Sequence, residues 1–175
     1  MNDLLPTIEP KYDHRHRGGV SRPLVVLPVV RDTPRTMPEE STTPDLQERV
    51  QQFGQALGRR DVDAAAAMFA PDAVWITSDF EGLFEGREAI RDLIDDFVRS
   101  FEDLQQETGE SRYLGGGATF SVVVQRGRPR DSTVFVERRV AAVAVWADGL
   151  IERLTTYTDI DEARAAAERL AEERG

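Results

Sequence analysis

The spacing of apolar residues changes at Glu107, and this change constrains the fold more than any other feature of the chain. Before it, apolar residues recur every three or four positions, as from Leu46 to Val50, which is the period of one helix face. After it the period is two, interrupted by glycines 115–117 and by a turn at 147–149. Helices followed by an antiparallel meander predict an α+β fold, with helices covering one face of a curved sheet.

Helix-capping and helix-breaking residues indicate the expected boundaries of the helices and strands. Asp61 is a helix N-cap and Pro71 a helix stop, so the second helix is expected to run between them. The chain 78–86 is expected to be an acidic, glycine-containing loop. The remaining expectations are helices from about 45, from about 87 and after 159, and strands at 73–78, 107–114, 118–124, 133–146 and 150–158.

Residues 1–44 differ in composition from the rest. They hold seven of the nine prolines and show no helical or strand period, which predicts a disordered Pro-rich tail before a domain at 45–175. The apolar run at 24–30 is split by Pro28. It is interpreted either as linker or as a strand that adds to a sheet edge of this chain or of a protein partner. Met37 is interpreted as a candidate alternative start of translation, because the residues after it have the pattern of the domain.

Composition excludes several function classes. Six of the 32 acids and six of the 22 bases lie in 1–44, so the domain keeps 26 acids against 16 bases. Such an excess repels phosphate backbones and argues against nucleic-acid binding. No apolar run is long enough for a membrane span. We therefore expect a soluble, cytoplasmic protein with no nucleic acid and no membrane among its partners.

The chain has no cysteine, and its two histidines, His14 and His16, lie in the tail. Thiolate chemistry, Ser-His-Asp hydrolysis and His-ligated metal catalysis are therefore not expected. We predict no metal and no cofactor.

The domain resembles a known family in the order of three segments: DVDAAAAMFAPDAVW, then FEGREAIRDLI, then QRGRPRDSTVFVERRVAAVAVWADGLIERLTTYTD. Together they resemble the SnoaL-like branch of the nuclear transport factor 2 superfamily over about 45–165. The resemblance implies a cone-shaped, curved antiparallel sheet wrapped around N-terminal helices and an apolar pocket, usually in a homodimer. It does not settle function, because the superfamily holds isomerases, epoxide hydrolases, cyclases and non-catalytic proteins.

Catalytic residues do not carry over with the resemblance. Where ketosteroid isomerases have a tyrosine, a general base and an oxyanion-hole acid, this chain has Phe53, Thr77 and Ala142. An epoxide-hydrolase aspartate falls at Thr156. A phenyl ring, a methyl group and threonine hydroxyls cannot replace these acids and bases, so no catalytic residue is assigned.

The candidate site is the lining of the implied pocket. On the last strand, alternation and the resemblance point Leu154 and Thr156 inward and Thr155 and Tyr157 outward. Arg138 is interpreted either as an arginine at the rim or as an anchor for an anionic ligand. The predicted ligand-binding residues are Phe53, Trp75, Thr77, Phe84, Arg138, Ala142, Trp146, Leu154 and Thr156.

Three functions remain open. The first is a module that binds a small apolar or aromatic ligand. The second is an isomerase, cyclase or hydrolase that uses a carboxylate, with Asp79 and Glu81 as candidates, and the third is a dimeric interaction or scaffold protein. Asp159, followed by Glu162, is interpreted as a helix cap rather than a catalyst. Phe135 and Val143 are expected on an outer sheet face that a second subunit covers.

Overall fold

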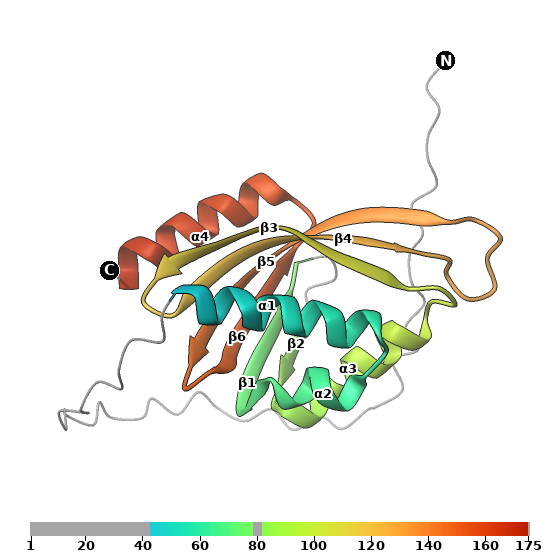
Figure 1. The fold of residues 1–175 in the computed structure, drawn as a ribbon, viewed down its shortest axis with the longest axis horizontal. Helices are drawn as coiled ribbons and strands as arrows, with labels where there is room; N and C mark the ends of the chain where they lie inside the picture. Colours follow the sequence, from blue (N-terminus) through green and yellow to red (C-terminus); the bar gives the residue numbers. More distant parts are fainter. Residues whose placement is uncertain (1–42, 79–81, 175) are drawn as a thin grey trace, which may run out of the picture. The chain divides into compact units, whose positions relative to one another are not determined.

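The computed structural model describes residues 43–78 and 82–174 (Figure 1). Predictions made for residues 1–42, for Asp79 and for Glu81 lie outside the described residues, whereas Thr43 and Pro44, which the sequence assigns to the tail, belong to the first helix. The elements are α1 (Thr43–Gly58), α2 (Val62–Ala67), β1 (Phe69–Thr77), β2 (Gly82–Glu85), α3 (Arg87–Arg99), β3 (Gln105–Gly115), β4 (Ala118–Gly127), β5 (Val136–Ala147), β6 (Leu150–Tyr157) and α4 (Ile160–Arg174).

The strands form one sheet in the order β2-β1-β6-β5-β4-β3. The last four strands are the antiparallel meander that the period-two region predicts. The partner of the first strand was not assigned from the sequence. In the structure β1 pairs in parallel with β6 and antiparallel with β2, so the sheet has six strands instead of the four of the meander.

Two local predictions were wrong. The sequence predicts loop at 82–85, but this segment is an edge strand in which Phe84 lies opposite Trp75. The second helix ends at Ala67, and the chain is extended from Phe69, before Pro71. Pro71 is exposed within a register shift between β1 and β6, where a strand tolerates a residue without an N–H.

Turn chemistry fixes two of the three hairpins of the meander. Asp148 and Gly149 both have positive φ, 51° and 74°, as a two-residue type I′ turn requires. Gly117, between β3 and β4, has φ 75°, and a Cβ there would lie 2.6 Å from the carbonyl oxygen of Trp146. Only glycine fits that position without strain.

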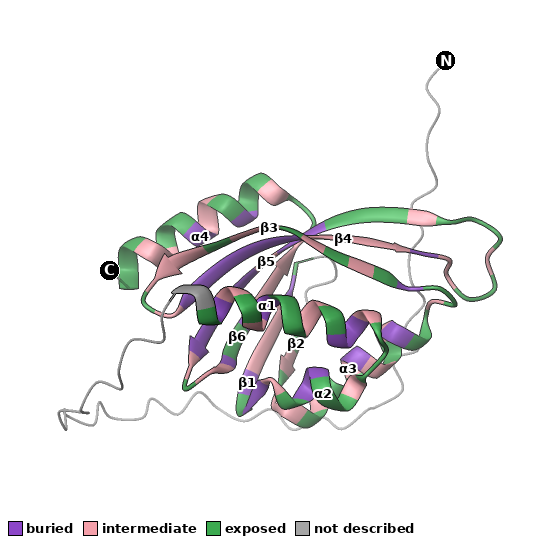
Figure 2. Ribbon diagram, viewed as in Figure 1, coloured by how far each residue is buried: buried purple, intermediate pink, exposed green. Residues whose placement is uncertain are grey.

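The first three helices cover one face of the sheet, which we call the inner face. The predicted stripe of α1 is buried, with Leu46 4% and Leu57 5% exposed, and Ile90 and Ile94 of α3 are almost fully buried. These helices and the inner face form the larger apolar core. Figure 2 shows the buried residues of the sheet running beneath α1.

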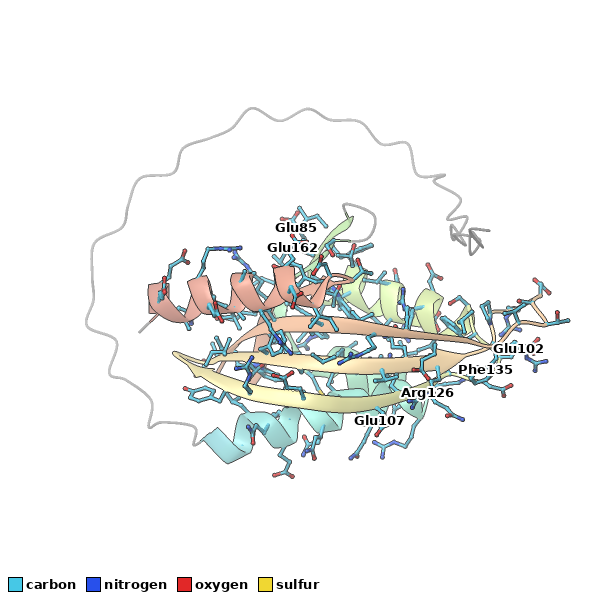
Figure 3. All side chains as sticks on the ribbon, turned by 90° about the horizontal axis from the view of Figure 1, so that it is seen from above. Glu85, Glu102, Glu107, Arg126, Phe135 and Glu162 are labelled. Carbon is cyan, nitrogen blue, oxygen red and sulfur yellow. The ribbon has the colours of Figure 1, made fainter. Side chains whose placement is uncertain are left out.

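The fourth helix covers the opposite, outer face. Figure 3 shows α4 and α1 on opposite sides of the sheet. Asp159 caps α4 as predicted, because its Oδ1 accepts from the N–H groups of Asp161 (2.9 Å) and Glu162 (3.0 Å). Ala163 of α4 packs in a second core that includes Val143.

This second core corrects one prediction for the outer face. Val143 is only 6% exposed, because α4 rather than a second subunit covers it. Phe135 is 56% exposed, as expected. No helix among the described residues is long and apolar enough to cross a membrane.

Candidate functional site

Small side chains line up across five strands of the inner face. Ser111 of β3 lies opposite Ser121 of β4, which lies opposite Ala142 of β5. Ala142 lies opposite Thr156 of β6, which pairs with Thr77 of β1. Residues directly opposite in neighbouring strands share a face, so four hydroxyl groups and one methyl group form a band, here called the hydroxyl row.

Some groups of the hydroxyl row are buried. Thr77 and Ser121 are 7% and 5% exposed. The Oγ atom of Ser111 is buried and has no hydrogen-bond partner in the structure. A buried hydroxyl without a partner costs about 1–3 kcal/mol, so a native structure normally supplies that partner from a water molecule or a ligand.

Aromatic rings flank one end of the hydroxyl row. Trp75 stacks on Phe69 with ring centroids 5.6 Å apart, and Phe53 of α1 meets Trp75 edge-on at 6.2 Å. The indole N–H of Trp75 donates to Oγ1 of Thr156 at 3.3 Å. Phe84 packs on the same core from β2. The structure thus brings together the predicted residues Phe53, Trp75, Thr77, Phe84, Ala142 and Thr156.

Trp146 and Leu154 share the inner face but lie in the packed core. They are 5% and 3% exposed. Trp146 donates its indole N–H to Oγ1 of Thr119 at 2.9 Å, a contact between two buried side chains. Both residues support the inner face, and the indole N–H of Trp146 is already satisfied.

Arg138 marks the far end of the inner face. Its Nε donates to Oε1 of Gln125 at 2.7 Å, and its guanidinium lies over the Phe97 ring of α3 at 5.8 Å. Gln125 lies opposite Gln106, whose Nε2 is buried without a hydrogen-bond partner. Arg138 is exposed, with Gln125 and the Phe97 ring as its neighbours.

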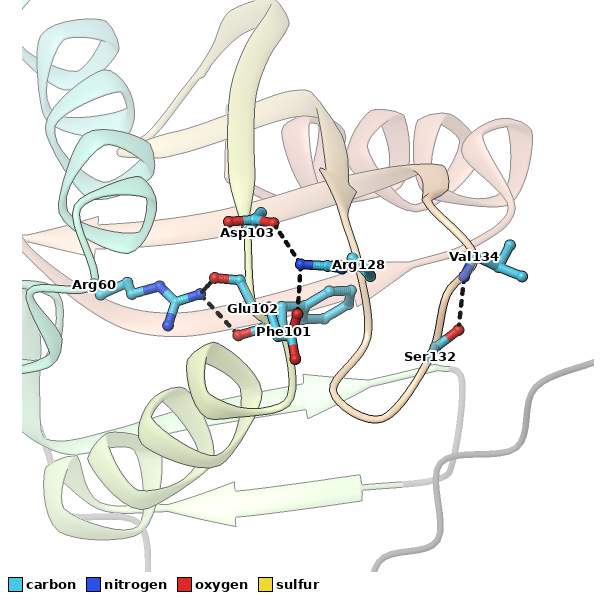
Figure 4. Close-up of polar contacts among 7 residues, drawn as sticks. All are labelled: Arg60, Phe101, Glu102, Asp103, Arg128, Ser132 and Val134. Atoms are coloured by element: carbon cyan, nitrogen blue, oxygen red, sulfur yellow. Dashed lines mark hydrogen bonds and ion pairs between the residues drawn. The ribbon is translucent and has the colours of Figure 1, made fainter.

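A polar clamp next to this end holds the connections between elements. Arg60 donates to the carbonyl oxygens of Phe101 and Glu102, and Arg128 pairs with Glu102 and Asp103 (Figure 4). Phe101 meets Phe97 edge-on at 5.5 Å. The clamp therefore holds the backbone of Phe101 and Glu102 next to the Phe97 ring.

Sequence reasoning missed the β3 and β4 part of the site. Thr119 and Ser121 alternate with Phe120 and Val122, and all four are buried. Polar residues that alternate inside a strand buried on both faces are a detectable signal, because each must face a partner or a ligand. The inward position of Ser111 could not be predicted in this way, because a register shift between Thr108 and Ser111 breaks the alternation of inward and outward residues along β3.

In the part of the chain that the structure describes, no group of three or more His, Asp or Glu side chains is arranged to hold a metal ion. Thr77 and Ala142 lie on the inner face, and Phe53 of α1 packs against the same core.

The fold is that of nuclear transport factor 2-like and ketosteroid isomerase-like proteins. A Catenulispora acidiphila protein with a ketosteroid isomerase-like fold, in complex with trimethylamine, is similar at 17% identity and TM-score 0.61, covering 72% of this chain and 94% of that one. A Mycobacterium tuberculosis protein in complex with estradiol-17beta-hemisuccinate is similar at 18% identity and TM-score 0.58, covering 69% and 97%. An M. tuberculosis LEH-like epoxide hydrolase is similar at 19% identity and TM-score 0.58, covering 73% of this chain and 92% of that one.

Residues 50–154 match the SnoaL-like domain family, and the chain belongs to it. This membership confirms the resemblance noted in the sequence. A comparison with curated proteins finds no match.

Proposed function

We propose that the domain binds a small, largely apolar molecule against the inner face of the sheet. The observation that carries this proposal is the hydroxyl row, which holds the buried, unpartnered Oγ of Ser111 at its β3 end and meets the Trp75 aromatic cluster at its β1 end. Apolar walls with a few placed polar groups are the usual composition of small-molecule sites. Similar folds that hold trimethylamine or a steroid ester support the proposal.

The row suits a ligand with one or two neutral oxygen atoms. Hydroxyl groups donate and accept, so they match a carbonyl or a hydroxyl of the ligand equally well. Arg138 adds a cation at the rim, where a carboxylate on a longer ligand would reach it. The inner face also offers rings for stacking, from Trp75 and Phe53.

The test is a titration of the full chain with estradiol, estradiol-17beta-hemisuccinate and 2-naphthol, followed by tryptophan fluorescence. Ser121→Ala should weaken binding of the tightest probe by about 5- to 20-fold, because one hydrogen bond is worth about 1–2 kcal/mol. Thr133→Val, at an exposed position between β4 and β5 and outside both the hydroxyl row and the outer-face groove, is the control and should leave affinity within twofold. Equal affinities in both variants, or no saturable binding of any probe, would contradict the proposal.

We also propose a homodimer, formed through the part of the outer face that α4 leaves open. α4 packs on β3 to β6, and Leu83 of β2 is 60% exposed. Its neighbour in the pairing, Ile76 of β1, is half-buried. Light scattering should give the mass of a dimer at micromolar concentration, and Leu83→Lys should shift it toward the monomer.

A further inference from the structure

A groove on the outer face lies between α4 and the strands β5 and β6, away from the hydroxyl row. Its volume is about 170 Å³. Val143 and Val145 of β5 and Leu170 of α4 supply apolar lining. A cavity of about 150 Å³ holds one benzene ring, so the groove has room for one small ring or a short alkyl chain.

Two guanidinium groups from different elements line this groove. Arg153 comes from β6 and Arg169 from α4. The structure shows no hydrogen bond or ion pair from either side chain to another residue that it describes. Carboxylates do pair with other arginines of the chain, namely Arg91, Arg99, Arg112, Arg126, Arg128 and Arg164. Two arginines without a carboxylate partner in one groove are unusual in a domain that has an excess of acids.

Two hydroxyl groups and one acid complete the polar lining. Thr155 and Tyr157 of β6 contribute the hydroxyls, and Glu173 of α4 the acid. Burial, followed by the negative charge of Glu162, raises the pKa of Tyr157, while Arg169 acts in the opposite direction. The phenol therefore stays protonated at neutral pH and can donate a hydrogen bond. With two cations against one lining anion, the groove favours an oxyanion.

We propose that this groove is a second binding site, which takes a small oxyanion carried on a single ring or short alkyl body. Arg153 and Arg169 pair with the oxyanion from two sides, because guanidinium groups bind carboxylate and phosphate oxygens by charge-assisted hydrogen bonds. Thr155 and Tyr157 donate to the same group. Val143, in the floor, contacts the apolar body.

The experiment uses the full chain and benzoate as the probe, with binding measured by calorimetry and by amide chemical shifts of Thr155 and Leu170. Benzoate should bind saturably, and benzamide, which has the same ring and no charge, should bind at least tenfold more weakly. Arg153→Gln and Arg169→Gln should each weaken benzoate by tenfold or more. Arg59→Gln, which removes an exposed charge outside the groove, should stay within twofold.

Additional probes identify the class of oxyanion, and one further variant distinguishes a loss of binding from a loss of folding. Phenyl phosphate and inorganic phosphate distinguish a carboxylate from a phosphate site, and inorganic phosphate should compete at least tenfold more weakly than the ring-bearing anions. Glu173→Gln should tighten benzoate, a gain that a misfolded variant could not show. Equal binding of benzoate and benzamide, wild-type affinity in both groove variants, or no shift at Thr155 would overturn the proposal.

Discussion

The indole N–H of Trp75 reaches across from β1 to Oγ1 of Thr156 on β6, at 3.3 Å. The two strands are parallel neighbours that come from opposite ends of the described chain. Oγ1 of Thr156 also contacts the carbonyl oxygen of Ile76 at 3.5 Å. The hydroxyl of Thr156 therefore orients the ring of Trp75 on the inner face, which gives the first prediction.

Thr156→Val should destabilise the domain by about 1–2 kcal/mol, because the half-buried indole N–H loses its acceptor. Thr155→Val is the matched control, since Thr155 lies one residue away on the outer face and is half-buried. Urea unfolding followed by circular dichroism measures both variants. A larger loss for Thr155→Val would show that the hydrogen bond of Thr156 contributes little.

The Trp146–Thr119 contact should couple energetically. Both residues are buried and their hydrogen bond is 2.9 Å long. Thr119→Val leaves the indole N–H without a partner, so we expect a loss of about 1–3 kcal/mol, and Trp146→Phe in the same chain should recover part of it. A double-mutant cycle measures the coupling, and strictly additive losses would argue against it.

Gly117→Ala should destabilise the domain by about 2 kcal/mol, because alanine is strained at φ 75° and its Cβ meets the carbonyl oxygen of Trp146. Gly58→Ala is the control. A Cβ at Gly58 meets nothing within 4 Å, and its φ lies outside the left-handed region. That variant should keep or slightly raise the thermal midpoint. Equal midpoints for the two variants would contradict the account of the β3–β4 hairpin.

The raised pKa of Tyr157 predicts a loss of stability at alkaline pH. Burial of the phenol is the main cause. A group whose folded pKa lies above its unfolded value stabilises the fold below the unfolded pKa, about 10 for tyrosine. This contribution is lost as pH rises through the folded pKa. Urea unfolding between pH 9 and pH 11.5 should show the decline, and Tyr157→Phe should reduce it. An unchanged slope in Tyr157→Phe would assign the decline to other groups.

Local patterns in the sequence predicted the parts of the fold that depend on near neighbours. The spacing of Asp159 to Glu162 predicts a helix cap, and in the structure Oδ1 of Asp159 accepts from the backbone N–H of Glu162. The same holds for the Asp148-Gly149 turn. Alternation along β6 separated Leu154 from Tyr157 correctly, and the structure places them in the inner and outer cores.

Features that depend on distant partners were not predictable in this way. The strand β2 has four residues, too few for a period to emerge, and it exists because β1 offers it an edge. The side of the sheet that α4 covers is set by Ala163 and Ala167 meeting Phe120 and Val143, which are remote in sequence. The hydroxyl row requires the register of five strands, so no single segment reveals it.

The most direct test of the central claim is which face of the sheet a bound ligand touches. In the complex with the tightest of the steroid and naphthol probes, intermolecular NOEs to methyl groups distinguish neighbours on one strand. We predict NOEs from the probe to the methyls of Ala142 and Thr156, which belong to the hydroxyl row. NOEs confined to the methyls of Val143 and Thr155, on the outer face, would contradict the account.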